Sequence, residues 1–279
     1  GINLVAKLPS IACYAYQSKV HYYDRDSLFI HYANPEYSIA ENFLSLLRKD
    51  QKFTDQEARL LDTILMLHAD HGGGNNSTFT NVVISSTGTD IYSTVSASIG
   101  SLKGPRHGGA NIKVAEMMDA VLEDVGGYTA DDKKLRAAVN RLMDGKLYDR
   151  SGLVYGFGHA VYTISDPRAE MLRACCAEVA KEKKQQTEFD FRQRFERAAL
   201  DVMKERKGTA LPTNVDYYSG FAYGMLNIPR DLYTPLFMCS RMVGWVAHNI
   251  ENKLYDGRIM RPATKYVGEN KDYMMMEER

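Results

Sequence analysis

Three short stretches of the sequence place histidine next to glycine, and a fourth places an aspartate among small and aromatic residues. They are His68–Asn75 (HADHGGGN), Gly104–Asn111 (GPRHGGAN), Gly156–Val161 (GFGHAV) and Pro212–Gly220 (PTNVDYYSG). Glycine lets the backbone approach a ligand closely or adopt a positive φ in a tight turn. A lone histidine is usually a surface or hydrogen-bonded core residue. Three similar loops, each at the end of a helical stretch, instead favour a functional site.

Metal binding is an alternative for two of these histidines, because His68 and His71 are three residues apart. No cysteine lies near them and the sequence has no HExxH pattern, so we expect no metal site. Gly156–Gly158 lacks the third glycine of a dinucleotide fingerprint, and neither a GxxxxGK[ST] loop nor a GxSxG turn occurs. The sequence therefore gives little support to phosphoryl transfer or serine hydrolysis.

The composition indicates a globular protein without a general affinity for nucleic acid. Hydrophobic residues make up 44% of the chain, and 35 basic residues balance 35 acidic ones. Nucleic-acid binding draws much of its affinity from neutralising phosphates, which a neutral chain does poorly. The basic cluster Lys181–Lys184 is interpreted as a solvated helix face. The four cysteines form no CxxC pair, which is typical of a reducing, intracellular compartment.

Most segments predict helices, and their ends carry recognisable capping signals. Thr54–Glu57 is a capping box, followed by an apolar face that includes His68. Asp166 and Pro167 are a good N-cap and first residue for a helix through the Cys175 region. Further helices are expected over Asn111–Val125, from Thr129, and from Arg230 or Asp231 to about Leu254.

Residues 77–102 are open to three interpretations. Asp90 is their only charge, which suggests a membrane span, but many serines and threonines make the segment too polar for that. The β-branched residues Val82–Ile84 make a strand possible. We favour one long buried helix, whose small side chains would let another helix approach closely, as at a subunit interface.

Taken together, the four stretches resemble the active-site segments of the citrate synthase family, in the family's order. GPRHGGAN is similar to GPLHGGAN, GFGHAVYTISDPR to the GFGHxVY…DPR segment, and NVDYYSG to NVDxxSG. SRMVGWVAHNIE and RIMRPATKYVG resemble the family's closing helix and C-terminal segment, so the likeness runs from about Ala6 to Gly268. The resemblance implies an all-α, citrate synthase-like fold with a large domain and a smaller closing domain.

The same resemblance implies roles for three residues. Asp216 would remove a proton from the methyl group of acetyl-CoA, and His107 would donate a hydrogen bond to the thioester carbonyl. His159 would bind the ketone oxygen of oxaloacetate and supply a proton as the carbon–carbon bond forms. Hydrolysis of the citryl thioester would then release citrate and CoA. Acetyl-CoA is expected as a co-substrate, with no permanently bound cofactor.

Arginines would grip the two carboxylates of oxaloacetate. The resemblance implies Arg168 and Arg241 as the clamps and His71 as a further ligand, with Arg261 supplied across a homodimer interface. For CoA, it implies a loop that receives the adenine, together with one polar residue of the aspartate segment. These CoA residues are Val154, Tyr155, Gly156, Phe157, Gly158 and Asn214.

Two positions depart from the family's pattern. Thr163 stands where the family often has a basic residue that helps to hold the CoA phosphates, so CoA affinity is expected to be weaker or to rest on other residues. Arg106 stands where leucine is common. A positive charge beside His107 should disfavour its protonated form, so Arg106→Leu is expected to raise the pKa of His107.

The alignment places residues 1–110 and 222–279 in the large domain and 111–221 in the small domain. Family members begin well before the segment that matches Ala6, so we expect further large-domain helices upstream. We expect a cytoplasmic homodimer that binds oxaloacetate and acetyl-CoA, with neither nucleic acid nor membrane as a partner. Two alternatives stay open: a 2-methylcitrate synthase that uses propionyl-CoA, and a folded, dimerising module without catalysis.

Overall fold

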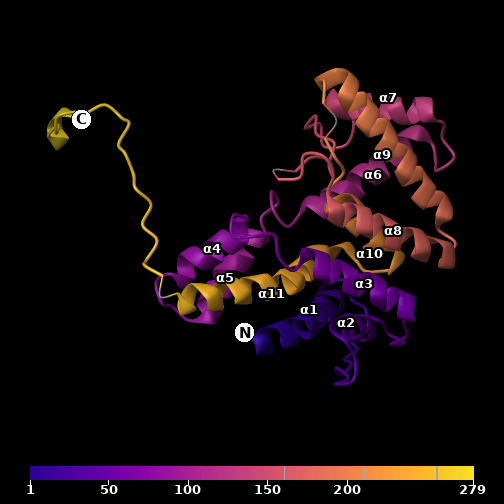
Figure 1. Cartoon of the computed structure of the whole chain (residues 1–279), viewed down its shortest axis with the longest axis horizontal. Helices are drawn as coiled ribbons and strands as arrows, with labels where there is room; N and C mark the ends of the chain where they lie inside the picture. The colour runs from indigo at the N-terminus through magenta and orange to yellow at the C-terminus, as the bar shows by residue number, and fades with distance from the viewer. Residues whose placement is uncertain (160, 210, 256) are drawn as a thin grey trace.

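The computed structural model describes residues 1–159, 161–209, 211–255 and 257–279, and their regular structure is helical (Figure 1). The α-helices are α1 (Ile2–Tyr23), α2 (Ile39–Leu47), α3 (Asp55–His68), α4 (Asn76–Ser85), α5 (Ile91–Leu102), α6 (Ala110–Val125), α7 (Asp132–Met143), α8 (Pro167–Glu182), α9 (Gln186–Lys207), α10 (Val215–Met225) and α11 (Tyr233–Leu254). Short 3₁₀ turns, η1 and η2, span Arg230–Leu232 and Met276–Glu278. The predicted all-α fold is confirmed.

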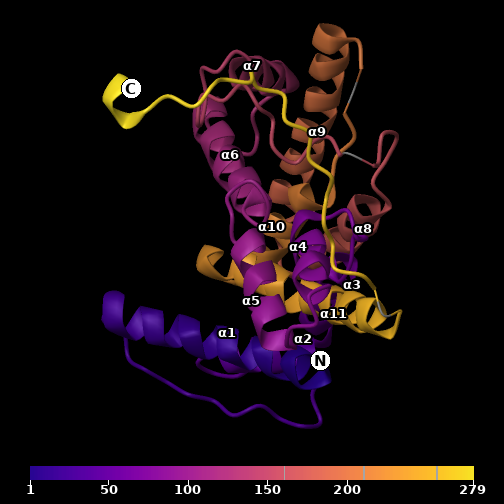
Figure 2. The ribbon, with the colours of Figure 1, turned by 90° about the vertical axis from the view of Figure 1, so that its left-hand side faces the viewer.

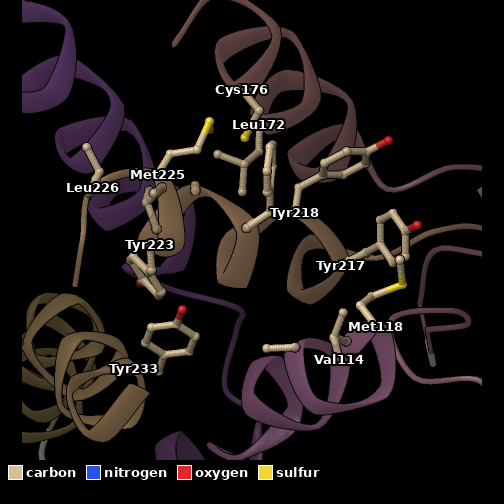
Figure 3. Close-up of a cluster of buried hydrophobic side chains, with 14 of the residues drawn as sticks. Val114, Met118, Leu172, Cys176, Tyr217, Tyr218, Tyr223, Met225, Leu226 and Tyr233 are labelled. Atoms are coloured by element: carbon tan, nitrogen blue, oxygen red, sulfur yellow. The ribbon is translucent and has the colours of Figure 1, made fainter. Parts of the chain in front are cut away.

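Helix α10 is the most deeply buried element and packs against α6 on one side and α8 on the other. Three of its tyrosines, Tyr217, Tyr218 and Tyr223, are at most 1% exposed. Figure 3 shows Tyr217 near Met118 and Val114 of α6, and Tyr223 facing Tyr233 of α11. Asp216 lies in the first turn of this helix, so the packing of the core fixes where its carboxylate can lie.

The remaining helices form two groups around α10. Helices α7 and α9 pack together at one end of the molecule, and α1 lies at the opposite end against α2 and α11 (Figure 2). Helix α3 contacts both α8 and α10, so the main core runs continuously from one group to the other. A smaller core lies between α5 and α11, around Val95, Leu102 and Trp245.

The predicted capping signals are confirmed. The Thr54 hydroxyl accepts from the backbone N–H of Glu57 at 3.2 Å, and the Glu57 carboxylate accepts from the backbone N–H of Thr54 at 3.0 Å. At the start of α8, Asp166 accepts from the backbone N–H of Arg168 at 3.0 Å, with Pro167 as the first helical residue. Each cap satisfies N–H groups that have no partner within the helix.

The expectation of one long helix over residues 77–102 is wrong, because the segment forms the hairpin α4–α5. Gly88 adopts a positive φ of 80° between the two helices. Asp90 then caps α5 by accepting from the backbone N–H groups of Tyr92 and Ser93 at 2.8 and 2.9 Å. The close approach inferred from the small side chains occurs between these two helices, where the Asn81 amide donates to the Ser98 hydroxyl at 3.1 Å.

Two helix starts differ from the sequence expectations. Helix α7 begins at Asp132 rather than Thr129, because the Asp131 side chain accepts from the backbone N–H of Lys134 and caps the helix there. Arg230 and Asp231 form a 3₁₀ turn, and α11 starts at Tyr233. After α11 the chain leaves the helical body as an extended, exposed tail (Figure 1). Among the described residues, no helix is both long and apolar enough to cross a membrane.

Candidate active site

The loop that carries His159 is fastened to the segment that leads into α10. The backbone N–H of Gly158 donates to Pro212 O at 2.7 Å, and that of Asn214 donates to Gly156 O at 2.9 Å. The Asn214 amide adds a bond to Gly158 O at 2.9 Å. Gly156 has a φ of 85°, and a Cβ there would lie 2.9 Å from the Tyr217 ring. The glycine is therefore required for the close approach that brings the His159 loop to the start of α10.

The ring of His159 has a defined tautomer. Its Nδ1 accepts from the backbone N–H groups of Val161 and Tyr162 at 3.0 and 3.1 Å, so that nitrogen carries no proton. A neutral ring then carries its proton on Nε2. Burial lowers the pKa of His159, and the positive charge of Arg168 lowers it further. His159 thus presents an N–H donor without a net charge.

Arg168 is held beside this donor by a buried carboxylate. Its Nε and Nη2 donate to the two oxygens of Asp166 at 3.0 and 2.9 Å, and Asp166 is 1% exposed. Burial acts to raise the pKa of Asp166, but the hydrogen bonds and charge of Arg168 outweigh it and lower that pKa. Arg168 Nη2 lies 3.5 Å from His159 Nε2. Both nitrogens carry hydrogens, so neither accepts a hydrogen bond from the other. They are neighbouring donors that a ligand could accept from.

His71, at the end of the segment after α3, closes one side of this space. Its ring centroid lies 4.7 Å from that of His159, with an interplanar angle of 77°. Burial lowers the pKa of His71, and the charges of Arg168, His159 and Arg241 act in the same direction. A neutral imidazole beside two guanidinium groups avoids like-charge repulsion and remains able to donate one hydrogen bond.

Arg241 of α11 is the most deeply buried arginine of the group, at 1% exposure. Its Nε donates to His68 O at 2.7 Å, and its guanidinium lies over the Phe237 ring at 4.9 Å from the centroid. Burial lowers the pKa of Arg241 to about 10. Within the described part of the chain, Nη1 of Arg241 is buried and has no hydrogen-bond partner. A buried, unsatisfied guanidinium N–H is costly unless a ligand completes it, and a carboxylate is the natural ligand.

Asp216 differs from the residues described so far because its pKa is raised. Burial raises its pKa to about 6, Asp166 acts in the same direction, and the charges of Arg168 and Arg241 oppose the rise. A carboxylate with a raised pKa is a stronger base than an exposed aspartate. The Asn214 side chain caps α10 by accepting from the backbone N–H of Asp216 at 3.1 Å, which fixes the direction in which the helix starts.

His107 makes hydrogen bonds with residues at the start of α4. Its Nε2 lies 3.0 Å from the Ser77 hydroxyl and 3.2 Å from Asn75 Oδ1, and the indole N–H of Trp245 donates to the same hydroxyl at 3.2 Å. Burial lowers the pKa of His107, followed by the charge of Arg241. The expected effect of Arg106 is therefore corrected: the direction of the shift is as expected, but the exposed Arg106 is not its cause.

The predicted residues thus fall into three sets by position. His71, His107, His159, Arg168 and Asp216 all lie within the electrostatic influence of Arg241 or of Arg168. The loop Val154–Gly158 lies beside Asn214, at the edge of this group. Arg261 is not brought into the group within this chain, because it lies on the exposed tail after α11.

Three functionally placed residues were not predicted as site residues. Asp166 was expected only as a helix cap, although it also holds Arg168 and accepts from the backbone N–H of Val215 at 3.2 Å. Ser77 orients His107, and Phe237 lies under Arg241 and 5.9 Å from the His107 ring. Asp166 could have been found from its place two residues before Arg168, whereas Ser77 and Phe237 have no local sequence signal. Across the described ranges, no three His, Cys, Asp or Glu side chains are grouped to hold a metal ion.

Comparison with known proteins shows which family the chain resembles. Residues 1–263 match the family described as citrate synthase, C-terminal domain. The citrate synthase of Haloferax volcanii is 37% identical over 281 residues, which are 99% of this chain and 66% of that protein. The 2-methylcitrate synthase of Shewanella oneidensis is 35% identical over 266 residues, 95% of this chain and 64% of that protein.

Solved structures show the same likeness. The citrate synthase of Pyrobaculum aerophilum has a TM-score of 0.79 at 31% identity, over 99% of this chain and 63% of that chain. A ternary complex of citrate synthase from Thermoplasma acidophilum with carboxymethyl coenzyme A and oxaloacetate also has a TM-score of 0.79, at 28% identity. It covers 99% of this chain and 68% of that chain.

The chain is shorter than these relatives, since it spans 66%, 59% and 60% of three curated citrate synthases. The match nevertheless extends over nearly all of its helical body, including every loop that carries a candidate catalytic side chain. On this basis, the chain belongs to the citrate synthase family.

Proposed function

We propose that this chain carries the catalytic residues for the condensation of acetyl-CoA with oxaloacetate to give citrate and CoA. The observation that supports the proposal most directly is a group of donors from three different elements. Arg241 Nη1 is buried and has no partner within the described part of the chain, Arg168 Nη2 lies 3.5 Å from His159 Nε2, and the charges of both arginines act on Asp216. A small dianion with a ketone group matches these donors.

Oxaloacetate would bind through its two carboxylates and its ketone oxygen. Arg168 and Arg241 would each hold a carboxylate, and His71 would add a donor. The carboxylate of Asp166 holds Arg168 in place, so little side-chain entropy is lost on binding. His159 Nε2–H would point at the ketone oxygen, which polarises the carbonyl carbon for attack.

Asp216 would then remove a proton from the methyl carbon of acetyl-CoA. With a pKa of about 6, most of its carboxylate is ionised at pH 7, while its basicity exceeds that of an ordinary aspartate. The proton moves to Asp216, and the electron pair of the C–H bond forms the enolate. The enolate oxygen needs a donor, and we propose the neutral ring of His107 for this role.

The donor role of His107 requires a particular tautomer. In the structure the Ser77 hydroxyl accepts from Trp245 and donates its one proton to Asn75 Oδ1 at 2.9 Å; rotation of the hydroxyl would turn that proton to His107 Nε2 instead. When Ser77 donates to Nε2, a neutral His107 carries its proton on Nδ1 and can donate it to the thioester oxygen. We propose that this is the active tautomer.

The remaining steps balance the reaction. The enolate carbon attacks the ketone carbon of oxaloacetate, and the developing alkoxide takes a proton from His159 Nε2. Water then attacks the citryl thioester and returns one proton to His159. The C–S bond breaks, the CoA thiolate takes the proton held by Asp216, and citrate and CoA leave. We propose that residues 111–221 close over residues 1–110 and 222–279 during these steps and exclude water from the enolate.

CoA would bind at the edge of this site. We propose that the loop Val154–Gly158 receives the adenine, with Asn214 beside it. Arg261 of the other subunit of a homodimer would join the residues that bind oxaloacetate. The hydrogen bonds between this loop and the start of α10 support the adenine site, because CoA binding would then be coupled to the position of Asp216.

We propose a reducing, cytoplasmic compartment for the protein. All four cysteines are free, which supports this proposal.

A 2-methylcitrate synthase activity is the second candidate, since a relative with that name is 35% identical. An additional methyl group in an apolar pocket changes specificity by only about 1–3 kcal/mol, so the two acyl-CoA substrates must be compared directly. Thiol release should be measured with oxaloacetate and either acetyl-CoA or propionyl-CoA, alongside calorimetric binding of oxaloacetate. Faster turnover of acetyl-CoA supports citrate synthesis, and faster turnover of propionyl-CoA supports the alternative. Oxaloacetate binding without thiol release would favour a non-catalytic module.

A further inference from the structure

Glu196 is a buried carboxylate that lies outside the proposed catalytic group. It belongs to α9 and is 7% exposed. Its Oε1 accepts from the Thr213 hydroxyl at 2.5 Å, and its Oε2 accepts from the Tyr218 hydroxyl at 2.5 Å. Burial raises the pKa of Tyr218, so its phenol remains protonated and able to donate. The carboxylate therefore uses both of its oxygens to bind two hydroxyl groups.

These two hydroxyls come from either side of Asp216. Thr213 lies three residues before it and Tyr218 two residues after it, so Glu196 spans the first turn of α10. The Tyr217 hydroxyl adds a third bond to α9, to Arg192 O at 2.7 Å. Thr213 is also paired with Phe157 in an isolated antiparallel bridge, two residues from His159. Glu196 is thus connected both to the helix turn that carries Asp216 and to the loop that carries His159.

A pocket that is open to solvent lies beside this carboxylate. A cavity of about 300 Å³ is lined by Glu196, Thr213, Tyr218, Asp166, Arg173 and Leu200, among other residues. In a close-packed interior, neighbouring side chains would hold the start of α10 in place. The core side of α10 is held in this way. On the side of the pocket, the three bonds from α9 connect the start of α10 to the neighbouring helix, in addition to the bond between Asp166 and the backbone N–H of Val215.

We propose that Glu196 is a positioning residue for Asp216: it anchors the first turn of α10 so that the Asp216 carboxylate stays buried beside Arg168 and Arg241. The charged groups that face Asp216 are Arg168 and Asp166 at the start of α8, and Arg241 of α11. Tyr223 is the remaining titratable neighbour. Arg173 approaches Glu196 to 4.0 Å. The expected loss of activity rests on the function proposed above, whereas the expected change in the position of Asp216 does not.

Two effects are expected when this anchor is weakened. A displacement of about 1 Å between reacting groups can lower a rate about 10²-fold, so kcat should fall. An Asp216 carboxylate that moves towards solvent loses part of the burial that raises its pKa, so that pKa should fall as well. Arg168, Arg241 and His71 are not held by Glu196, so the KM for oxaloacetate should change little.

The test is Glu196→Gln, which keeps the side-chain shape but faces one of the two donors with an N–H group. We expect kcat to fall about 10- to 100-fold, and KM for oxaloacetate to stay within about threefold. The pKa of Asp216, followed by ¹³C NMR of its carboxyl and assigned with Asp216→Asn, should fall by about one unit. Thr213→Val should act in the same direction, and Thr213→Ser, which keeps the hydroxyl, should restore both values.

The matched control is Glu205→Gln, the same change on the same helix at an exposed ion pair with Arg136. It should leave kcat and the pKa of Asp216 as in the unaltered chain. A Glu196→Gln protein with a lower Tm but an unchanged pKa of Asp216 would overturn the proposal, since only a structural role would remain. If no variant releases CoA, the NMR titration still decides the positional role, and only the proposed function fails.

Discussion

The raised pKa of Asp216 has a consequence for stability that does not depend on activity. Burial raises this pKa from 3.8 to about 6 on folding, a shift of about two units. Because the folded state holds the proton more tightly, the favourable contribution is present below pH 4 and is lost as the pH rises through 6. At 1.36 kcal/mol per unit, the ionised carboxylate costs the folded protein about 3 kcal/mol at pH 7 and above.

Asp216→Asn removes this cost, because the amide has nearly the same shape and cannot ionise. The variant should therefore gain stability over the unaltered chain between pH 4 and pH 7, by about 2 kcal/mol. Any change that the amide makes to hydrogen bonding does not depend on pH, so it shifts the whole curve without changing this difference. Urea unfolding of both proteins at pH 4, 5, 6, 7 and 8 measures it, and thiol release should be lost at every pH.

A control with the opposite sign is available in Asp149. Burial acts to raise the pKa of Asp149, but hydrogen bonds from Tyr155 and Ser151 outweigh it and lower that pKa to about 2. Relative to the unaltered chain, Asp149→Asn should accordingly lose stability as the pH rises from 2 to about 4, so this control is measured in that range. A stability difference between Asp216→Asn and the unaltered chain that is constant from pH 4 to pH 8 would refute the account of Asp216.

Three further predictions concern the proposed oxaloacetate site. Arg241→Met should weaken oxaloacetate binding by about 2–5 kcal/mol in calorimetry and raise the pKa of His107 in an NMR titration, whereas Arg106→Leu should leave that pKa unchanged. Binding within twofold of the unaltered chain would contradict this. Asp166→Asn should destabilise the fold by about 3 kcal/mol in urea, because it leaves the Arg168 guanidinium without its buried counter-charge. Equal stability would count against this pairing. Ser77→Ala should lower kcat about tenfold and shift the ¹⁵N signals of the His107 ring towards the Nε2–H tautomer. Unchanged ¹⁵N shifts would argue against the role of Ser77.

Features that depend on a few neighbouring residues were predictable from the sequence. The capping box at Thr54 and the cap at Asp166 formed as expected, since their hydrogen bonds join residues two or three apart. The apolar stripe of α6 is buried for the same reason, because its spacing matches the helical repeat. The segment 77–102 was harder, because Gly88 and Asp90 interrupt it with a turn signal that is weaker than the run of small residues around it.

The candidate catalytic residues themselves could be named only through the resemblance to a family. Nothing in the spacing of His71, His107, His159 and Asp216 shows that their side chains approach one another, because they lie up to 145 residues apart along the chain. Helix packing brings the rings of His71 and His159 together and places both Asp216 and His107 within the electrostatic influence of Arg241.

Their chemical properties were also beyond prediction from the sequence. The pKa of Asp216 and the unpartnered guanidinium N–H of Arg241 depend on burial and on groups from other helices. The cause of the His107 shift was misassigned to Arg106 for this reason: adjacency in sequence placed a charge beside the ring, whereas folding turned it to solvent and brought Arg241 closer. Local sequence specifies helices and their caps, because those interactions are short-range. Burial and charge at the site are sums over distant residues, which are defined only once the chain is packed.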